Sequence, residues 1–414
     1  MSHPPRPDPG APLPPEPAGG PVVQVTLKGG LGNRMIQFLA AYRLASLVPG
    51  CRIGNVTLPE WGIHLPPIAP GPEPMTYLRD SIAAGGQRID LADIAAALND
   101  GTVARVEMDH FGQDLRNLPS RDVAAALFPP GVPPIARFGR DTLLINIRGE
   151  EILTGVHPHY TLLPVPFYQE LVARTGLTPV FLGQIAPNPY TDALRAGFPD
   201  ARFITSHGAA TDFATLRHAR NVVVAVSTFS WLAAWLSEAE RIFLPLSGFL
   251  NPAQSPDIHL LPLDDPRYRF ILFPFNPAVP VAEAAAAHAA LAGTWRLMGA
   301  DMIAELMTRR PRFPVSAHAM RAEFDEAFYL ARYPDVREAV RRDAYHSAYE
   351  HYAFEGHAEG REPFALDRAW YCRAYPLAAI EVGQGDFAGL HHHYVAVGRA
   401  RGYAPLPPGA AGSP

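Results

Sequence analysis

Cysteine and long apolar runs are scarce in this chain of 414 residues. Its two cysteines, Cys51 and Cys372, lie far apart and match neither a disulfide framework nor the spacing of a metal site, so we expect buried thiols in a reducing compartment. No apolar run approaches the roughly 20 residues that span a bilayer, and no charged-then-apolar signal segment opens the chain. These absences favour a cytoplasmic protein and leave only peripheral contact with a membrane open.

Lysine is rarer still, because Lys28 is the only one in the sequence. Arginine supplies the rest of the positive charge, and abundant alanine, proline and arginine are typical of a GC-rich bacterial genome. The formal net charge is -5, and no block of residues carries charge of a single sign. Proteins that bind nucleic acids present a clustered basic face, so the charge pattern argues against a nucleic-acid partner.

The single lysine opens a glycine-rich stretch at 28–37, KGGLGNRMIQ, directly after an apolar run at 22–27. A strand, then glycines, then a helix is the layout in which backbone amides and a helix N-terminus bind an anion. A tight turn, with glycines at positive φ and in close packing, explains the same residues equally well. The stretch has neither the GxGxxG nor the GxxxxGK(S/T) spacing, so both interpretations stay open.

Short apolar strands alternate with helices through the middle of the chain, which predicts parallel βαβ units and a doubly wound α/β fold. In the first half we expect strands at 22–27, 52–57 and 103–108, and helices at 34–47 and 121–127. In the second half we expect strands at 142–147, 179–182, 202–204, 222–226 and 242–244, and helices at 166–174, 191–196, 212–219 and 230–237. Ligands of such sheets bind beyond the carboxyl ends of the strands, here 148–151, 183–184, 206–207, 227–228 and 247–248.

The composition divides the chain into six segments. We expect a disordered Pro-rich tail (1–20), an N-terminal Rossmann-like lobe (21–138), a second Rossmann-like lobe (139–277), a helical linker (278–322), two helical repeats (323–404) and a short tail (405–414). The repeats have an offset of 42 residues, which separates Asp325 from Asp367 and His351 from His393. Because the offset places both histidines beside a tyrosine, we expect the run His391-His392-His393 to pack rather than to bind metal.

Three groups of polar residues are candidates for a ligand site. Arg148 follows a strand and can bind a phosphate through its planar fork, and its neighbours Glu150 and Glu151 are either a general base or its ion-pair partners. The hydroxyl-rich turn Ser227–Ser230 either caps a helix or contacts a phosphate. In the loop at 157–160, His157, His159 and Tyr160 favour substrate contact over metal, because the spacing places no third metal ligand.

Two of these segments resemble one known family. The stretch at 29–37 is similar to the GGLGNQxFQ opening of alpha-1,2-fucosyltransferases and related GDP-fucose enzymes, and 227–235 resembles their STFSWWAA segment. Between them, 145–151 falls where that superfamily carries an HxRxGD-type motif. The C-terminal module resembles FDxxYYLxxYPDV…HYxxxGxxEGR repeats that are appended to bacterial surface-polysaccharide and secretion-related proteins.

The resemblance implies a GT-B-like fold of two Rossmann-like lobes, here with a C-terminal all-α repeat module. It also implies an inverting transfer, without a metal or other cofactor, of fucose from a GDP-sugar to a glycan or polysaccharide acceptor. Carried over by position, Arg148, Glu150, Glu151 and Asn33 are the catalytic candidates. The donor-binding candidates are Gly30, Gly32, Asn33, Arg34, Asn146, Arg148, Gln184, Asp212, Ser227, Thr228, Phe229 and Ser230, and the acceptor candidates are His157, His159 and Tyr160.

Three positions depart from the family pattern: Asn146 replaces the histidine, Arg34 replaces the glutamine, and Glu150-Glu151 replaces the Gly-Asp pair. These departures motivate one alternative to the enzyme, a non-catalytic protein that binds a glycan or a nucleotide sugar. The C-terminal repeats motivate another, an adaptor that engages a protein partner through them.

Overall fold

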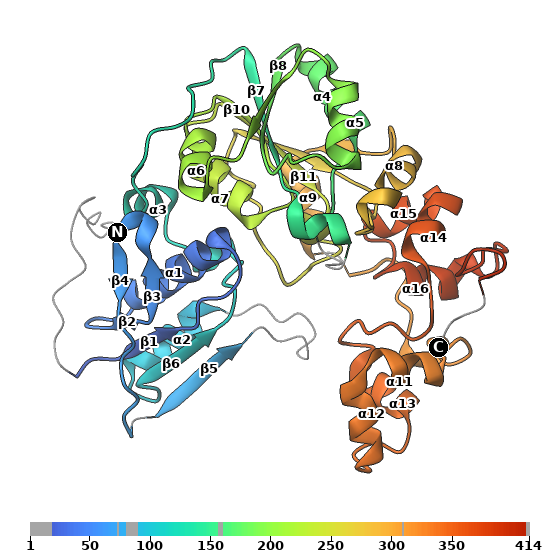
Figure 1. The fold of residues 1–414 in the computed structure, drawn as a ribbon. Coiled ribbons are helices and arrows are strands. Elements are labelled where there is room, and N and C mark those ends of the chain that lie inside the picture. Colours follow the sequence, from blue (N-terminus) through green and yellow to red (C-terminus); the bar gives the residue numbers. More distant parts are fainter. Residues whose placement is uncertain (1–18, 73, 80–89, 156–159, 309, 411–414) are drawn as a thin grey trace.

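The computed structural model describes residues 19–72, 74–79, 90–155, 160–308 and 310–410. Figure 1 shows two α/β lobes in blue and in green to yellow, followed by helices in orange and red. Most of the tail predicted at 1–20 lies outside the described residues, as do the last four residues of the tail predicted at 405–414.

The first lobe is built on a parallel sheet with strand order β2-β1-β6-β5. Its strands are β1 (Val22–Val25), β2 (Arg52–Gly54), β5 (Met75–Arg79) and β6 (Arg105–Asp109), and its helices are α1 (Leu31–Ser46), α2 (Leu91–Asn99) and α3 (Arg121–Leu127). Apolar side chains at alternate positions of β1 and β6, such as Val23 and Val106, are fully buried in the hydrophobic core that α1 shares. Alternation of this kind places one face of a sheet against a core.

Two expectations for this lobe were wrong in detail. The strand predicted at 52–57 is two strands, because Asn55 adopts a positive φ of 62° that ends β2 and turns the chain into β3 (Val56–Leu58). β3 pairs with β4 (Ile63–Leu65) in a separate antiparallel hairpin around a short turn of helix, η1 (Pro59–Trp61). Neither β5 nor α2 was predicted.

The second lobe holds a seven-stranded sheet with order β13-β12-β11-β10-β7-β8-β9. Its strands are β7 (Thr142–Ile147), β8 (Thr178–Gly183), β9 (Arg202–Thr205), β10 (Asn221–Val223), β11 (Arg241–Leu246), β12 (Tyr268–Leu272) and β13 (Arg296–Met298). Its helices are α4 (Val165–Thr175), α5 (Pro189–Gly197), α6 (Ala209–Arg217), α7 (Thr228–Trp235), α8 (Val281–Ala290) and α9 (Ala300–Thr308). In Figure 1, α4, α5 and α8 lie on one side of the sheet, and α6 and α7 on the other.

The segment predicted as a helical linker at 278–322 is only partly helical. It contains α8, α9 and the short α10 (Ala317–Met320), but β13 pairs antiparallel with β12 and extends the sheet of the second lobe. The remaining strand pairs of this sheet are parallel. The predicted fold class is confirmed: two α/β lobes with parallel sheets, the two-lobe arrangement of a GT-B-like fold, precede an all-α module. No helix among the described residues is long and apolar enough to cross a membrane.

The two C-terminal repeats have matching helices. The first contains α11 (Glu326–Arg332), α12 (Pro334–Arg341) and α13 (Ala348–His351), and the second contains α14 (Arg368–Ala374), α15 (Pro376–Gly383) and α16 (Leu390–His393). The repeated histidine and tyrosine form a buried pair in each repeat, with 3.1 Å between Tyr329 Oη and His351 Nδ1 and 3.0 Å between Tyr371 Oη and His393 Nδ1. The structure thus gives these repeated residues the packing role that the offset predicted.

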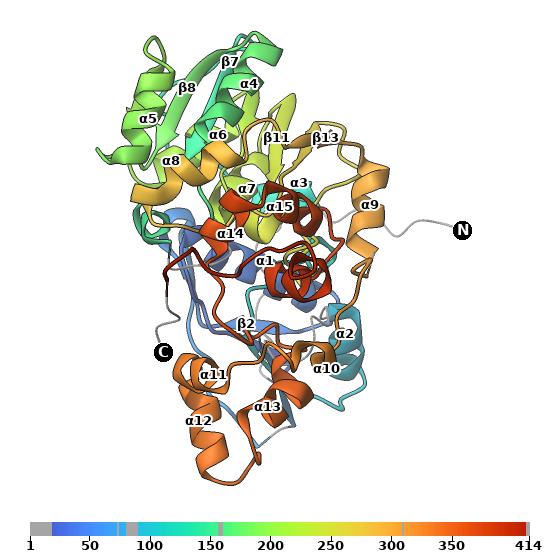
Figure 2. The ribbon, with the colours of Figure 1, turned by 90° about the vertical axis from the view of Figure 1, so that its right-hand side faces the viewer.

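The second repeat is joined to the second lobe by hydrogen bonds. The amide of Phe275 donates to Ala379 O at 2.7 Å, and Asn251 Nδ2 donates to Gly383 O at 3.1 Å. A Cβ on Gly383 would lie 2.5 Å from Pro274 Cα, so only glycine fits this approach of two backbones. Figure 2 shows α14 and α15 beside α8, with the first repeat farther from the second lobe.

The burial of His391 in the second repeat predicts a pH dependence of stability. Burial lowers the pKa of His391 to about 4, and its Nε2 lies 3.0 Å from Phe364 O. A histidine with a depressed pKa stabilises the fold above its unfolded pKa of about 6.5, and this contribution is lost as the pH falls toward 4. From pH 7.5 to pH 5, we expect His391 to remove roughly 2 kcal/mol from the free energy of unfolding of the module that contains it.

Thermal unfolding at the two pH values tests this expectation. Replacing His391 with glutamine should reduce the loss of stability in acid, whereas the same change at the exposed His318 should leave it as in the unmodified chain. Equal acid sensitivity in all three proteins would contradict the assignment to His391.

Candidate functional site

The N-terminus of α1 is accessible and has no acidic residue in its first turn. Gly29, at φ 75°, turns the chain after β1, and Gly30 is the N-cap in an extended conformation. Both glycines are exposed, and Gly30, as the N-cap, makes no side-chain cap hydrogen bond. The first helical residues, Leu31 to Asn33, are buried, so the exposed backbone of Gly29 and Gly30 is what offers an anion hydrogen-bond donors at the positive end of the dipole of this 16-residue helix.

Gln37 holds the glycine loop in place. Its Oε1 accepts a hydrogen bond from the Lys28 amide at 3.0 Å, and its Nε2 donates to Thr26 O at 3.1 Å and His110 O at 3.3 Å. Gln37 is fully buried, so these bonds join α1 to the ends of β1 and β6 without competition from water. The last residue of the motif therefore serves as an internal support for the loop.

Asn33 is mostly buried, and its Oδ1 accepts a hydrogen bond from Gln113 Nε2 at 3.1 Å. The structure places it next to the loop that follows β6, where Gln113 had not been identified from the sequence. Arg34, next in the chain, is partly exposed, and its Nε is buried without a hydrogen-bond partner among the described residues. Their predicted donor contacts, and the catalytic role given to Asn33, stay predictions.

Gly32 lies at a close contact between the two lobes. A Cβ on Gly32 would lie 2.4 Å from the backbone N of Phe229 and 2.6 Å from its Cα, at the start of α7. The absence of a side chain thus lets α1 and α7 touch backbone to backbone. Of the two interpretations of the glycines, close packing describes Gly32, whereas Gly29 and Gly30 remain open to an anion.

The turn from β10 to α7 uses its hydroxyl groups for different purposes. Ser227 is the N-cap, but its Oγ makes no cap hydrogen bond and instead lies 3.4 Å from Arg148 Nη1. Ser230 is fully buried, and its Oγ accepts a hydrogen bond from the Ala225 amide at 3.0 Å. The Ser230 hydroxyl therefore stabilises the turn in this structure, and its predicted contact with the donor stays a prediction. Thr228 is also buried, and Phe229 packs against the core.

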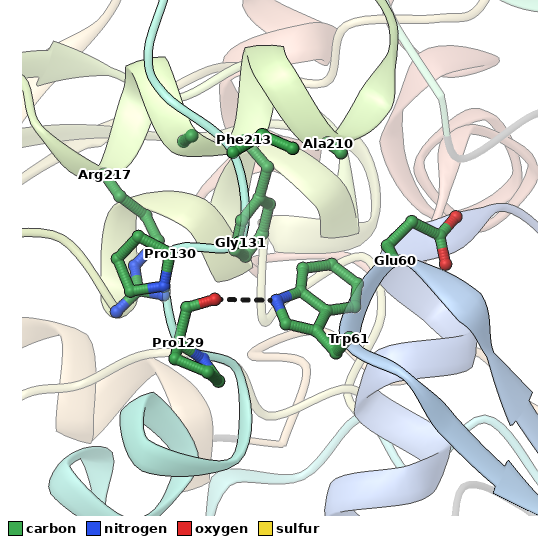
Figure 3. Close-up of a pocket in the computed structure, with 10 residues that line it drawn as sticks. Glu60, Trp61, Pro129, Pro130, Gly131, Ala210, Phe213 and Arg217 are labelled. Atoms are coloured by element: carbon green, nitrogen blue, oxygen red, sulfur yellow. Dashed lines mark hydrogen bonds between the residues drawn. The ribbon is translucent and has the colours of Figure 1, made fainter.

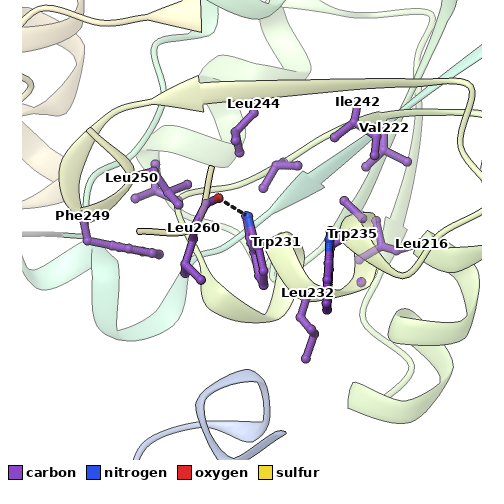
Figure 4. Close-up of a cluster of buried hydrophobic side chains, with 14 of the residues drawn as sticks. Leu216, Val222, Trp231, Leu232, Trp235, Ile242, Leu244, Phe249, Leu250 and Leu260 are labelled. Atoms are coloured by element: carbon purple, nitrogen blue, oxygen red, sulfur yellow. Dashed lines mark hydrogen bonds between the residues drawn. The ribbon is translucent and has the colours of Figure 1, made fainter. Parts of the chain in front are cut away.

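Buried contacts of its two tryptophans fix the position of α7. Figure 4 shows Trp231 and Trp235 among buried aliphatic side chains, and the two rings stack with centroids 5.5 Å apart. Trp231 Nε1 donates to Leu260 O at 2.6 Å, which satisfies the buried indole. The N-terminal end of α7, and Ser227 with it, therefore has a fixed position beside Arg148.

Two polar residues support the strand end that carries Arg148. Asn146 is buried and donates from Nδ2 to Leu182 O at 3.1 Å, across β7 and β8. Gln184 Oε1 accepts from the Gly149 amide at 2.9 Å, directly after Arg148. These two hydrogen bonds therefore help to position the strand end that carries the partly exposed Arg148. The predicted contacts of Asn146 and Gln184 with the donor stay predictions.

The other predicted residues lie around this strand end. Asp212 is buried in the first turn of α6, and its Oδ1 accepts from the His207 amide at 3.0 Å, which orders the loop after β9. Glu150 and Glu151 start a short helical turn, η3 (Glu150–Thr154), immediately after Arg148 and Gly149. The Tyr160 ring packs on Phe249, with centroids 5.2 Å apart. His157 and His159 lie outside the described residues.

A buried carboxylate that sequence reasoning missed joins the lobes beside Asn33. Asp114 lies 3.3 Å from His259 Nδ1 and 2.6 Å from Arg116 Nη2, and the Leu115 amide donates to His259 O at 2.8 Å. Burial would raise the pKa of Asp114, but the hydrogen bonds from His259 and Arg116 outweigh burial and hold this pKa well below its usual range. Because 145 residues separate the partners, no local pattern could have indicated this contact.

An aromatic seam forms another contact between the lobes. The Trp61 ring lies edge-on to Phe128 and Phe213, with centroids 5.0 and 5.7 Å apart. Figure 3 shows the small pocket beside this seam, where Trp61 Nε1 donates to Pro129 O at 3.1 Å and Arg217 closes one end. None of the predicted site residues lines this pocket, and we interpret it as part of the lobe interface.

These contacts bring two positive features together. The exposed amides at the start of α1 belong to the first lobe, and Arg148 beside Ser227 belongs to the second, while the Gly32–Phe229 contact keeps the two helix starts adjacent. Neither α1 nor α7 has an acidic residue in its first turn. Amides, helix dipoles and a guanidinium in this arrangement can bind a diphosphate and stabilise negative charge that develops on it.

Comparison with known proteins gives distant structural similarities. No family model and no curated protein sequence matches the chain. A mutant of Arabidopsis thaliana FUT1 in complex with GDP is similar over 55% of this chain and 71% of its own, with 11% identity and a TM-score of 0.36. The iron-containing dodecameric glycosyltransferase TibC of enterotoxigenic E. coli is similar over 55% and 58%, with 14% identity and a TM-score of 0.29. Similarity at this level assigns neither a family nor an activity.

Gly32 gives a direct test of the lobe contact. Replacing it with alanine places a methyl group on the backbone of Phe229, which cannot rotate away as a side chain can. We expect the free energy of unfolding to fall by about 1–3 kcal/mol, which calorimetry would detect as a melting temperature lowered by several degrees.

Gly30→Ser is the matched control for this substitution. A Cβ at Gly30 meets nothing within 4 Å, and serine is a favourable N-cap residue, so stability should be kept. Equal stability of Gly32→Ala and the unmodified chain would show that the lobes do not meet at this point in solution.

Proposed function

We propose that the chain is a glycosyltransferase that transfers a sugar, fucose, from a GDP-sugar to a glycan or polysaccharide acceptor. The proposal depends on one observation above all: Arg148 is held at Ser227 while the exposed start of α1 abuts the same turn through Gly32. The motif resemblance of 29–37 and 227–235 supports GDP-fucose as the donor.

In this proposal the diphosphate lies between Arg148 and the amides at Gly29 and Gly30. As the bond from the sugar C1 to the β-phosphate oxygen breaks, its electron pair stays on the phosphate. The Arg148 guanidinium and the helix dipole of α1 stabilise the charge that develops there. These groups can supply the positive charge that a divalent cation supplies in other transferases, which supports a transfer without a metal. The motif resemblance supports inversion.

A non-catalytic nucleotide-sugar binding protein is the second candidate. It is favoured by Asn146, which stands at the family's histidine and is buried in a hydrogen bond to Leu182 O. An asparagine amide exchanges no proton at neutral pH, so this position cannot serve as an acid or a base. Release of GDP from a GDP-sugar by the pure protein would exclude this candidate.

Calorimetric titration with GDP tests the proposed donor site. Arg148→Ala removes a charge-assisted hydrogen-bond donor to phosphate, and we expect GDP to bind roughly 10- to 100-fold more weakly. Arg148→Lys keeps the charge without the planar fork, and its affinity for GDP should lie between those of Arg148→Ala and the unmodified chain. A screen of GDP-, UDP- and dTDP-sugars identifies the donor.

Arg140→Ala is the control for nonspecific loss of positive charge, because Arg140 is exposed and paired with Glu240 at the surface. It should bind GDP as the unmodified chain does. Equal binding by Arg148→Ala, or no binding by the unmodified chain, would refute the proposed function.

A further inference from the structure

The only lysine of the chain is paired with a carboxylate at the carboxyl end of the first-lobe sheet. Lys28 Nζ lies 3.0 Å from Asp109 Oδ1 and 3.1 Å from Asp109 O. The same ammonium stands over the Phe111 ring, 4.7 Å from its centroid. Lys28 follows β1 and Asp109 ends β6, and these strands are neighbours in the sheet, so the fold brings the two side chains together.

The pair is accessible, and it lies next to the proposed diphosphate site. The side chains are 30% exposed at Lys28 and 45% exposed at Asp109, with Lys28 as the described side-chain partner of Asp109. Gly29 and Gly30 follow Lys28 directly, and three residues lie between Lys28 and Gly32 at the lobe contact. At about 3.8 Å for each step along the chain, the Cα atoms of Lys28 and Gly32 are at most about 15 Å apart.

Stability alone does not account for this arrangement. An exposed ion pair contributes about 0–1 kcal/mol to folding. Among the described residues, every other ion pair has arginine or histidine as its cation. Lysine differs from arginine because it presents a compact ammonium with three donors that can be shared with a second oxygen. A carboxylate beside an ammonium offers an acceptor and a donor side by side, which suits a sugar hydroxyl.

We propose that Lys28 and Asp109 form the acceptor subsite, with Asp109 as the general base; this inference rests on the proposed function. The Asp109 carboxylate accepts a hydrogen bond from the attacking hydroxyl of an acceptor sugar, and Lys28 fixes the carboxylate and donates to a neighbouring sugar oxygen. As the hydroxyl oxygen forms its bond to C1 of the donor sugar, its proton passes to Asp109. The bond from C1 to the β-phosphate oxygen breaks at the same time, and GDP leaves with that electron pair.

The chain offers a matched control on the same strand. Glu107 precedes Asp109 by two residues, so both side chains point to the same face of β6, and Glu107 is ion-paired with Arg105. Glu107→Gln and Asp109→Asn therefore remove the same charge from the same strand and face. A nonspecific effect of the lost negative charge, or unfolding, would lower sugar binding and turnover in both variants. Loss of the acceptor subsite would lower them in Asp109→Asn alone.

Sugar binding is the first readout. Methyl galactoside, methyl glucoside and methyl mannoside are added to the GDP-saturated protein, and saturation-transfer NMR measures their binding. We expect binding of at least one hexoside by the unmodified chain and by Glu107→Gln, with at least tenfold weaker binding by Asp109→Asn. No hexoside binding by the unmodified chain, or equal binding by Asp109→Asn, would overturn the proposal.

Turnover is the second readout. It is measured with the sugar nucleotide and the hexoside that the unmodified chain is found to bind. We expect Asp109→Asn to lower kcat by roughly 10²- to 10⁴-fold and to remove the fall in rate toward acid pH, with an unchanged Kd for GDP. If GDP does not bind the unmodified chain, the proposed function itself fails. If GDP binds and Asp109→Asn keeps its rate and its acid limb, only the acceptor subsite is wrong.

Discussion

The contact between Gly32 and the backbone of Phe229 is the constraint on which the rest of the site depends. It lets α1 of the first lobe and α7 of the second begin next to each other, and a single methyl group would prevent it. Since α1 continues directly from the glycine loop, this contact also sets where the exposed amides of Gly29 and Gly30 lie relative to Arg148. The Asp114–His259 bridge and the Trp61 seam hold the lobes in the same relation from two further points.

Burial separates the residues of the site into supporting residues and accessible ones. Polar residues of the motif stretches, such as Gln37, Asn146 and Ser230, are buried and bonded to the backbone. They make the loop, the strand end and the turn rigid, and rigidity is what a preorganised anion site requires. Arg148 and the start of α1 remain as the accessible groups, and Lys28 with Asp109 extends them toward the first lobe.

The elements of the second lobe could be predicted because β7 to β11 are short continuous apolar runs that alternate with helices. β12 escaped notice because Arg269 interrupts its apolar run, and β13 because it has only three residues, of which Arg296 and Leu297 are exposed. The strand-end rule predicted Arg148 and Ser227 at the same edge of the sheet, and the structure places the two side chains together. The role of Gly32 could not be predicted, because the sequence does not distinguish a glycine that approaches a phosphate from one that packs against a neighbouring helix.

A crystal structure of the chain with bound GDP tests the central claim most directly. We expect the β-phosphate within hydrogen-bond distance of the Arg148 guanidinium and of an amide at Gly29 or Gly30, with the Gly32–Phe229 contact intact. A β-phosphate bound away from both Arg148 and the start of α1 would contradict the account, as would lobes that separate at Gly32 to admit the nucleotide.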